Sequence, residues 1–233
     1  MKKLLAFTLT ELLIALTIIG AISAMTVPNI VNNYQRNAYV VQLRKVVNEI
    51  VSASDLVITE ESKTRFAHTS YFNGNQMQNF INEKFKVNKT CNNTTGCFSN
   101  ENYITINGDG SNAFSLANCD SSTAYLLTNG AAICAHKDNT GITYYIDING
   151  PDKPNIGGRD MFTIFYDANS EKVGTNYEDE DCENGDYEGM SEEEKDEAIK
   201  ACQARNANKH CATSTMGTGC YEELVNANWH MSY

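Results

Sequence analysis

The sequence predicts an α+β fold, in which a long N-terminal α-helix packs against an antiparallel β-sheet of four to six strands and is followed by a disulfide-stapled C-terminal region. Three observations predict this fold. An apolar run near the N-terminus continues into an amphipathic pattern, apolar and polar residues alternate from about residue 103, and all eight cysteines follow the helix. A period of three to four residues is typical of a helix, and a period of two is typical of a strand.

The predicted helix begins in the apolar run of residues 7–29 and ends at about Thr59. At 1.5 Å per residue it would be about 80 Å long, whereas the hydrocarbon core of a bilayer is only ~30 Å thick. The half from residue 31 to 59 must therefore form the spine of a soluble domain. Apolar or small residues recur there every three or four positions after Pro28, at Ile30, Val31, Tyr34, Val40, Leu43, Val47, Ile50, Ser54 and Val57.

One carboxylate, Glu11, lies in the apolar run. A charged side chain inside a membrane helix costs roughly 2.5–3.5 kcal/mol even on the lenient insertion scale, so it indicates a function and requires a partner. No Lys or Arg lies between Lys3 and Arg36. A free amine, produced on a neighbouring copy by cleavage between Ala6 and Phe7, would serve as that partner.

The leader MKKLLA, the residues FTLTE and the apolar helix that follows resemble the cleavage and methylation motif of type IV prepilins and type II secretion pseudopilins. The resemblance implies a pilin-like fold and a membrane peptidase that cuts before Phe7 and methylates its amine. It also implies that Glu11 guides subunit addition and that the helix is loosened or kinked at Pro28. Ala6 departs from the usual Gly before the cut, and we expect slower processing.

Two other readings of the N-terminus remain open, a cleaved secretory signal with its site at residues 21–24 and a plain membrane anchor. Glu11 would fall inside the apolar region of such a signal, where charge is disfavoured. The formal net charge of −11 becomes 16 − 29 = −13 for side chains once the leader lysines are removed. Such a surface repels nucleic acid, and we expect no nucleic-acid partner.

The resemblance divides the chain into a leader of residues 1–6, a transmembrane and filament-core helix of residues 7–30, and a periplasmic or extracellular domain of residues 31–233. It implies a structural, non-enzymatic subunit of a type IV pilus-like or type II secretion pseudopilus filament. The protein would cross the inner membrane once with its C-terminal domain outside the cytoplasm, and then enter an extracellular pilus or a periplasmic pseudopilus. Its partners would be copies of itself or related pilins, the prepilin peptidase, the assembly platform and a separate motor ATPase.

Two alternatives stay open. The first is a minor tip pilin that acts as an adhesin or binding module through its acidic, disulfide-stapled C-terminal region. The second is a membrane-anchored periplasmic hydrolase, which nothing beyond the anchor supports. The four histidines lie in unrelated settings without a nucleophile motif, so we identify no catalytic residue.

The middle of the chain predicts one short helix and several strands. Residues 60–74 are expected to form a loop and residues 75–85 a helix with one apolar face. Residues 103–107 and 113–117 are expected to pair as a hairpin. A second hairpin is expected around Asn129 and Gly130, because Asn-Gly between apolar runs favours a tight turn. Strands are also expected at residues 142–148 and 161–166.

The eight cysteines indicate disulfides, because an even number of them follows a membrane-anchoring helix, in the part expected outside the cytoplasm. Eight cysteines allow 105 pairings, of which the local bridges Cys91 with Cys97 and Cys119 with Cys134 are favoured. A zinc site is the alternative, but no C-x-x-C occurs, and Cys134 with His136 or Cys211 with His210 come nearest to it. The complete set is Cys91, Cys97, Cys119, Cys134, Cys182, Cys202, Cys211 and Cys220.

The C-terminal part changes character at residue 174, where an acidic, Cys-containing excursion extends to about residue 213. Ser191 and Glu194 have the spacing of a capping box, so a helix is expected from there to about Ala204. An acidic cluster at residues 178–181, with Asn184 and Asp186, is read as solvated charge. Beyond it, Leu224, Val225 and Trp229 are expected to dock onto the domain.

The segment of residues 147–162 gathers five oxygen-bearing side chains in one loop: Asp147, Asn149, Asp152, Asn155 and Asp160. Oxygen ligands brought together by a tight turn are what Ca²⁺ requires, so calcium is the candidate cofactor. The loop also resembles one common among pseudopilin-like proteins, some of which bind calcium. The alternative is that these side chains bond to their own backbone and fix a strand connection.

Overall fold

The computed structural model describes residues 8–74, 76–175, 182, 185, 187, 189–231 and 233, without the side chains of residues 29, 204, 205 and 207–209. The chain divides into two compact units, Met1–Ala38 and Tyr39–Tyr233.

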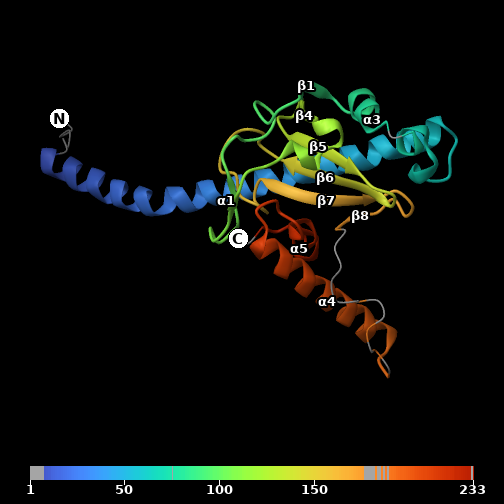
Figure 1. Cartoon of the computed structure of the whole chain (residues 1–233). Helices are drawn as coiled ribbons and strands as arrows, with labels where there is room; N and C mark the ends of the chain where they lie inside the picture. Colours follow the sequence, from blue (N-terminus) through green and yellow to red (C-terminus); the bar gives the residue numbers. More distant parts are fainter. Residues whose placement is uncertain are drawn as a thin grey trace, which may run out of the picture. The chain divides into compact units, whose positions relative to one another are not determined.

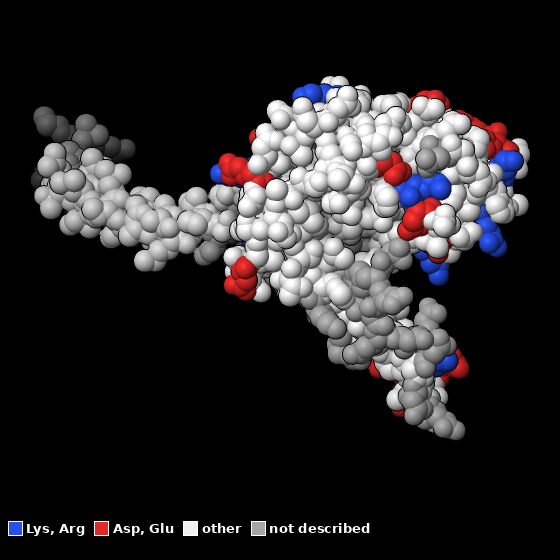
Figure 2. Space-filling model, in the orientation of Figure 1, with Lys and Arg blue, Asp and Glu red and all other residues white. Residues whose placement is uncertain are grey.

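The first element, α1, is one continuous helix of 52 residues, Leu9–Glu60, which confirms the long helix expected from the sequence. In the N-terminal unit its large apolar side chains are exposed, and Figure 2 shows this segment almost without charged atoms. From Tyr39 onward its apolar residues become buried at helical spacing, with Leu43, Val46 and Ile50 at 0% exposure. One helix thus supplies an exposed apolar rod and the spine of a folded domain.

The sheet of the second unit has six strands in the order β1-β4-β5-β6-β7-β8, all antiparallel (Figure 1). This confirms an antiparallel sheet of the expected size. The hairpin at Asn129 and Gly130 joins β4 to β5 as expected, and Gly130 has φ of +90° there. The strands are β1 (Val87–Cys91), β4 (Ala124–Leu127), β5 (Ala132–Lys137), β6 (Gly141–Asp147), β7 (Met161–Asp167) and β8 (Val173–Gly174).

Both faces of the sheet are covered, because successive strand residues point to opposite sides. Ile133 and Tyr144 face the core that contains α1. Ala132, Cys134 and Tyr145 face a second, smaller core built from the segment between β1 and β4. That segment includes Cys97 and Cys119, whose disulfides tie it to Cys91 of β1 and Cys134 of β5. These bridges help a stretch with little regular structure to cover a sheet.

Three local predictions in the middle of the chain need correction. Residues 60–74 are not only a loop, since they contain η1 (Phe66–His68) and α2 (Ser70–Asn73). The hairpin at residue 103 consists of the short strands β2 (Tyr103–Ile104) and β3 (Ser111–Asn112), outside the main sheet. Residues 113–117 are not a strand, and two short helices follow, η2 (Leu116–Asn118) and η3 (Asp120–Ser122). The expected apolar-faced helix is confirmed as α3 (Met77–Lys84).

The C-terminal helices are α4 (Glu192–Thr213) and α5 (Cys220–Asn226). The capping box of Ser191 and Glu194 opens α4 as predicted, but the helix extends well past Ala204. Leu224 is buried and Trp229 packs on Tyr221 at 5.7 Å between ring centroids, whereas Val225 is 39% exposed and does not dock. Residues 178–181, Asn184 and Asp186 lie outside the described residues.

All eight cysteines are paired, which confirms the disulfide prediction and both favoured local bridges. Because each sulfur is committed to a bridge, the zinc alternative at Cys134 and Cys211 is wrong. The bridges are Cys91–Cys97, Cys119–Cys134, Cys182–Cys202 and Cys211–Cys220.

Candidate functional site

The first candidate site is the start of α1, where Glu11 lies in the first helical turn. Its Oε2 accepts hydrogen bonds from the backbone N–H and the hydroxyl of Thr8, both at 2.9 Å. In return, Thr8 Oγ1 accepts the backbone N–H of Glu11 at 3.2 Å. This reciprocal arrangement is a capping box, which satisfies N–H groups that have no partner inside the helix. Ala6 and Phe7, the expected cleavage residues, lie outside the described part of the chain.

Two hydroxyls in the apolar segment that follows Glu11 are bonded to the helix's own backbone. The hydroxyl of Thr17 donates to the carbonyls of Leu13 and Ile14, and that of Thr26 donates to Ile22. Such bonds satisfy hydroxyls that would otherwise be costly to place in lipid. Among the described residues, one helix near the N-terminus, α1, is long and apolar enough to span a membrane.

The second candidate site is the β6–β7 connection, where Asp147 ends β6 in a fully buried position. Its Oδ2 accepts a hydrogen bond from the hydroxyl of Tyr103, and its Oδ1 accepts the N–H of Asn149 at 3.2 Å. The Tyr103 hydroxyl itself accepts the N–H of Ser99 at 3.1 Å. Asp147 therefore links its own loop to the segment that covers the outer face of the sheet.

Asp160, also fully buried, closes the other end of this connection. Its two carboxylate oxygens accept the N–H groups of Asn155 at 2.7 Å and Ile156 at 2.6 Å. Asn155 has φ of +58°, a left-handed conformation that Asn tolerates better than most residues. The carboxylate thus fixes a backbone turn that would otherwise leave two N–H groups without partners.

The other three candidate ligands hold different positions. Asn149 donates through Nδ2 to the carbonyls of Asp152 and Lys153, at 2.6 and 2.7 Å. Asp152 itself is exposed at the surface. Asn155 donates to Ser99 Oγ at 2.9 Å. The Oδ1 atoms of Asn149 and Asn155 are buried and have no hydrogen-bond partner in the described chain.

Burial dominates the electrostatics of this connection. Loss of solvent raises the pKa of Asp147 well above its usual range, the charge of Asp160 adds to this, and the Tyr103 hydrogen bond opposes it. Burial likewise raises the pKa of Asp160 to about 6, although two backbone N–H groups favour its ionised form. Burial and the neighbouring Asp147 raise the pKa of the Tyr103 hydroxyl.

The connection is also held against the C-terminal disulfide. Gly158 has φ of +84°, and a Cβ built on it would lie 2.5 Å from Cys220 Sγ and 3.1 Å from Cys211 Sγ. Only glycine fits this position, because any side chain would collide with the bridge. The β6–β7 connection, the outer cover of the sheet and the Cys211–Cys220 region therefore form one tied assembly.

These contacts bring Asp147, Asp160 and Asn155 together but leave Asp152 at the surface. Within the described ranges no group of three or more His, Cys, Asp or Glu side chains is arranged to hold a metal ion. The carboxylates of Asp147 and Asp160 already accept hydrogen bonds from N–H or O–H groups. This agrees with the alternative that these side chains fix a strand connection by hydrogen bonding to the backbone. Calcium binding therefore stays a prediction, with the two partnerless amide oxygens as its remaining ligands.

Sequence reasoning missed several residues that these sites use. Thr8 could have been found, because Thr-x-x-Glu before an apolar run is the capping-box pattern. Tyr103 and Ser99 carry no local signal, since Tyr103 lies 44 residues before Asp147 and meets it only after the sheet has formed.

No protein-family model, curated protein or solved structure matches this chain.

Proposed function

We propose that this protein is a structural subunit of a type IV pilus-like or type II secretion pseudopilus filament. The observation that carries the proposal is the division of α1 into two environments. Its second half is buried in the domain core, whereas its first half exposes apolar side chains such as Leu12, Ile19 and Ile22, each more than half exposed. Apolar surface of this extent requires lipid or other protein surfaces to cover it.

The same segment suits both covers in turn. In storage it would span the inner membrane, with the domain of residues 31–233 outside the cytoplasm. In the filament it would pack against the equivalent helices of other subunits. Glu11 would then neutralise the methylated amine of Phe7 on a neighbouring copy, while Thr8 satisfies part of its hydrogen-bonding capacity. An assembly platform and a separate motor ATPase would supply the work, and the subunit itself would catalyse no reaction.

The first test is the N-terminus of the mature protein, measured by mass spectrometry of the N-terminal peptide. We expect a chain that begins at Phe7 with a methylated amine. A chain that begins after Ala24 would show a secretory signal instead and would refute the filament proposal.

The second test separates docking from capping at Glu11. Glu11→Val should remain in the membrane fraction, because it removes a charge from an apolar segment, but should be lost from sheared filaments. Thr8→Val is the matched control, since it breaks the capping box but keeps the carboxylate. Wild-type assembly of Glu11→Val, or an equal defect in both variants, would show that the carboxylate does not direct assembly.

A minor tip pilin differs from a major subunit in abundance. Quantifying the chain in sheared filaments separates the two, because a major subunit dominates the preparation and a tip subunit is scarce.

A further inference from the structure

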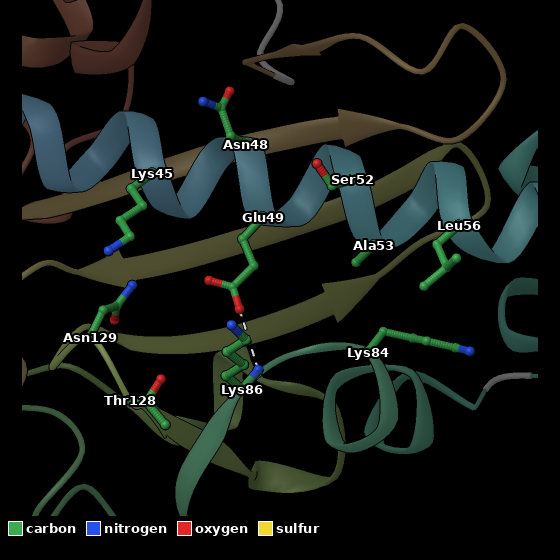
Figure 3. Close-up of a pocket in the computed structure, with 10 residues that line it drawn as sticks. All are labelled: Lys45, Asn48, Glu49, Ser52, Ala53, Leu56, Lys84, Lys86, Thr128 and Asn129. Atoms are coloured by element: carbon green, nitrogen blue, oxygen red, sulfur yellow. Dashed lines mark hydrogen bonds between the residues drawn. The ribbon is translucent and has the colours of Figure 1, made fainter.

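The domain carries a groove of about 520 Å³ between α1 and the β1 edge of the sheet. One wall is the face of α1 that carries Lys45 and Glu49, and the other is formed by Lys84, Lys86 and the β4–β5 turn at Asn129 (Figure 3). Two hydrogen bonds hold the walls in place. The backbone N–H of Lys86 donates to Glu49 Oε1 at 3.3 Å, and the side-chain Nε2 of Gln42 donates to the backbone carbonyl of Asn129 at 3.3 Å. The groove is therefore preformed.

The walls of the groove carry three lysines against one carboxylate, in a chain of net charge −11. Lys84 is already engaged, because it forms an ion pair with Glu60. Among the described residues no carboxylate forms an ion pair with Lys45 or Lys86, and both side chains are exposed. Two ammonium groups at a hollow of an acidic protein favour an acidic occupant.

The chain itself contains a surface of the opposite charge at the start of α4. Glu192 and Asp196 are four residues apart on this helix, as are Glu193 and Glu197, and all four side chains are exposed. Like charges at this spacing face each other and destabilise a helix. No ion pair joins these carboxylates to a cation within the described part of the chain. A cationic partner would relieve their repulsion.

The groove and the acidic start of α4 belong to different edges of the sheet. The groove lies beside β1, which is one edge of the sheet. In contrast, α4 packs on α5 and α5 packs on β7, next to the other edge (Figure 1). Two complementary surfaces on different sides of one subunit form a heterologous contact, which builds an open helical polymer when its rotation does not close. The two surfaces do not have to reach each other within one chain, because they belong to different copies.

We propose that the lysine groove of one copy receives the acidic first turns of α4 from a second copy. This inference rests on the proposed filament function and deepens it by naming a contact between domains. Exposed ion pairs change an equilibrium by about fivefold at most. The contact therefore fixes the relative position of neighbouring subunits, which packing of α1 already holds at high local concentration. Salt weakens the contact.

Charge reversal tests the contact in the full-length chain. Lys45→Glu with Lys86→Glu should reduce filament yield on the order of tenfold, and Glu193→Lys with Glu197→Lys should do the same. The chain that combines all four changes should regain most of the yield, because each reversed groove meets a reversed helix. This rescue also shows that the variants fold.

A matched control reverses two exposed lysines outside the groove, Lys63→Glu with Lys172→Glu, and should assemble like wild type. The proposal is overturned if the groove variant behaves like this control, or if the combined chain assembles no better than either pair of changes alone.

Zero-length carbodiimide cross-linking gives a readout that does not depend on filament yield. Cells moved from light- to heavy-isotope medium during expression contain both kinds of copy, and should yield mixed-isotope peptides that join Lys45 or Lys86 to Glu193 or Glu197. The measurement is made on filaments and on native membranes. Cross-links found only within one copy, or only at other residues, would overturn the proposal. A wild-type chain that never enters filaments would refute the proposed function, while the membrane cross-links would still decide the groove contact.

Discussion

Replacing Tyr103 by Phe removes one hydroxyl from the tied assembly at the β6–β7 connection. That hydroxyl donates to Asp147 Oδ2 and accepts the N–H of Ser99, and the Tyr103 side chain is fully buried. The variant therefore leaves a buried carboxylate and a backbone N–H each short of one partner. Phe fills the same space, so no cavity contributes to the loss.

A hydrogen bond to a charged group contributes about 1.5–3 kcal/mol, and an unsatisfied buried group costs about 1–3 kcal/mol. We expect Tyr103→Phe to lower the free energy of unfolding by roughly 2–4 kcal/mol. For a domain of this size the melting temperature should fall by roughly 4–16 °C. The assay is thermal and urea unfolding of the domain of residues 31–233, with disulfides intact.

Tyr144→Phe is the matched control. Tyr144 is also fully buried, but its hydroxyl has no hydrogen-bond partner in the described chain. Its removal should be nearly neutral or slightly stabilising. The reasoning is refuted if Tyr103→Phe costs no more than Tyr144→Phe.

The pH dependence of the loss gives a second check. The Tyr103 hydroxyl favours the ionised form of Asp147, so removing it raises the pKa of this carboxyl further. The folded variant then holds the proton more tightly, and its deficit relative to wild type should grow as pH rises. A deficit that shrinks with rising pH would contradict this assignment.

Three further predictions concern the same domain. Asp160→Ala should cost roughly 2–4 kcal/mol, because the N–H groups of Asn155 and Ile156 lose their acceptor. A wild-type melting temperature that rises in millimolar calcium but not in sodium of equal ionic strength would show that calcium binds the folded chain. Burial raises the pKa of Glu222 to about 7, so the folded state binds more protons than the unfolded chain between about pH 4.5 and 7. Stability should therefore fall as pH rises through that window, and Glu222→Gln should reduce the fall by on the order of 3 kcal/mol in unfolding titrations. An unchanged slope would remove Glu222 as the cause. Leu43→Ala should cost about 2–5 kcal/mol in urea unfolding, against less than about 0.5 kcal/mol for the exposed Val41→Ala, and equal losses would contradict packing of α1 through this face.

The elements that the sequence predicted correctly are those marked by a local repeat of apolar residues or by a turn motif. The helix α1, the hairpin at Asn129 and Gly130 and the strands β6 and β7 each repeat an apolar residue at helical or strand spacing, or carry a turn signal. These signals can be read from the sequence, because contacts between residues four positions apart depend only on neighbours in the chain. β1 was missed because Asn88, Lys89 and Thr90 are exposed on an edge strand, so no apolar alternation marks it.

The sequence by itself also predicted that Asp147 and Asp160 belong to one strand connection, and it established that all eight cysteines lie after the apolar helix. Only the tertiary structure decided what those residues contact. Asp147 meets Tyr103 across 44 positions, and Gly158 meets the Cys211–Cys220 bridge, because the sheet and its cover bring distant segments together. Such pairs cannot be read from local spacing in the sequence. They form because two distant segments bury apolar surface against each other, and this does not depend on their distance along the chain.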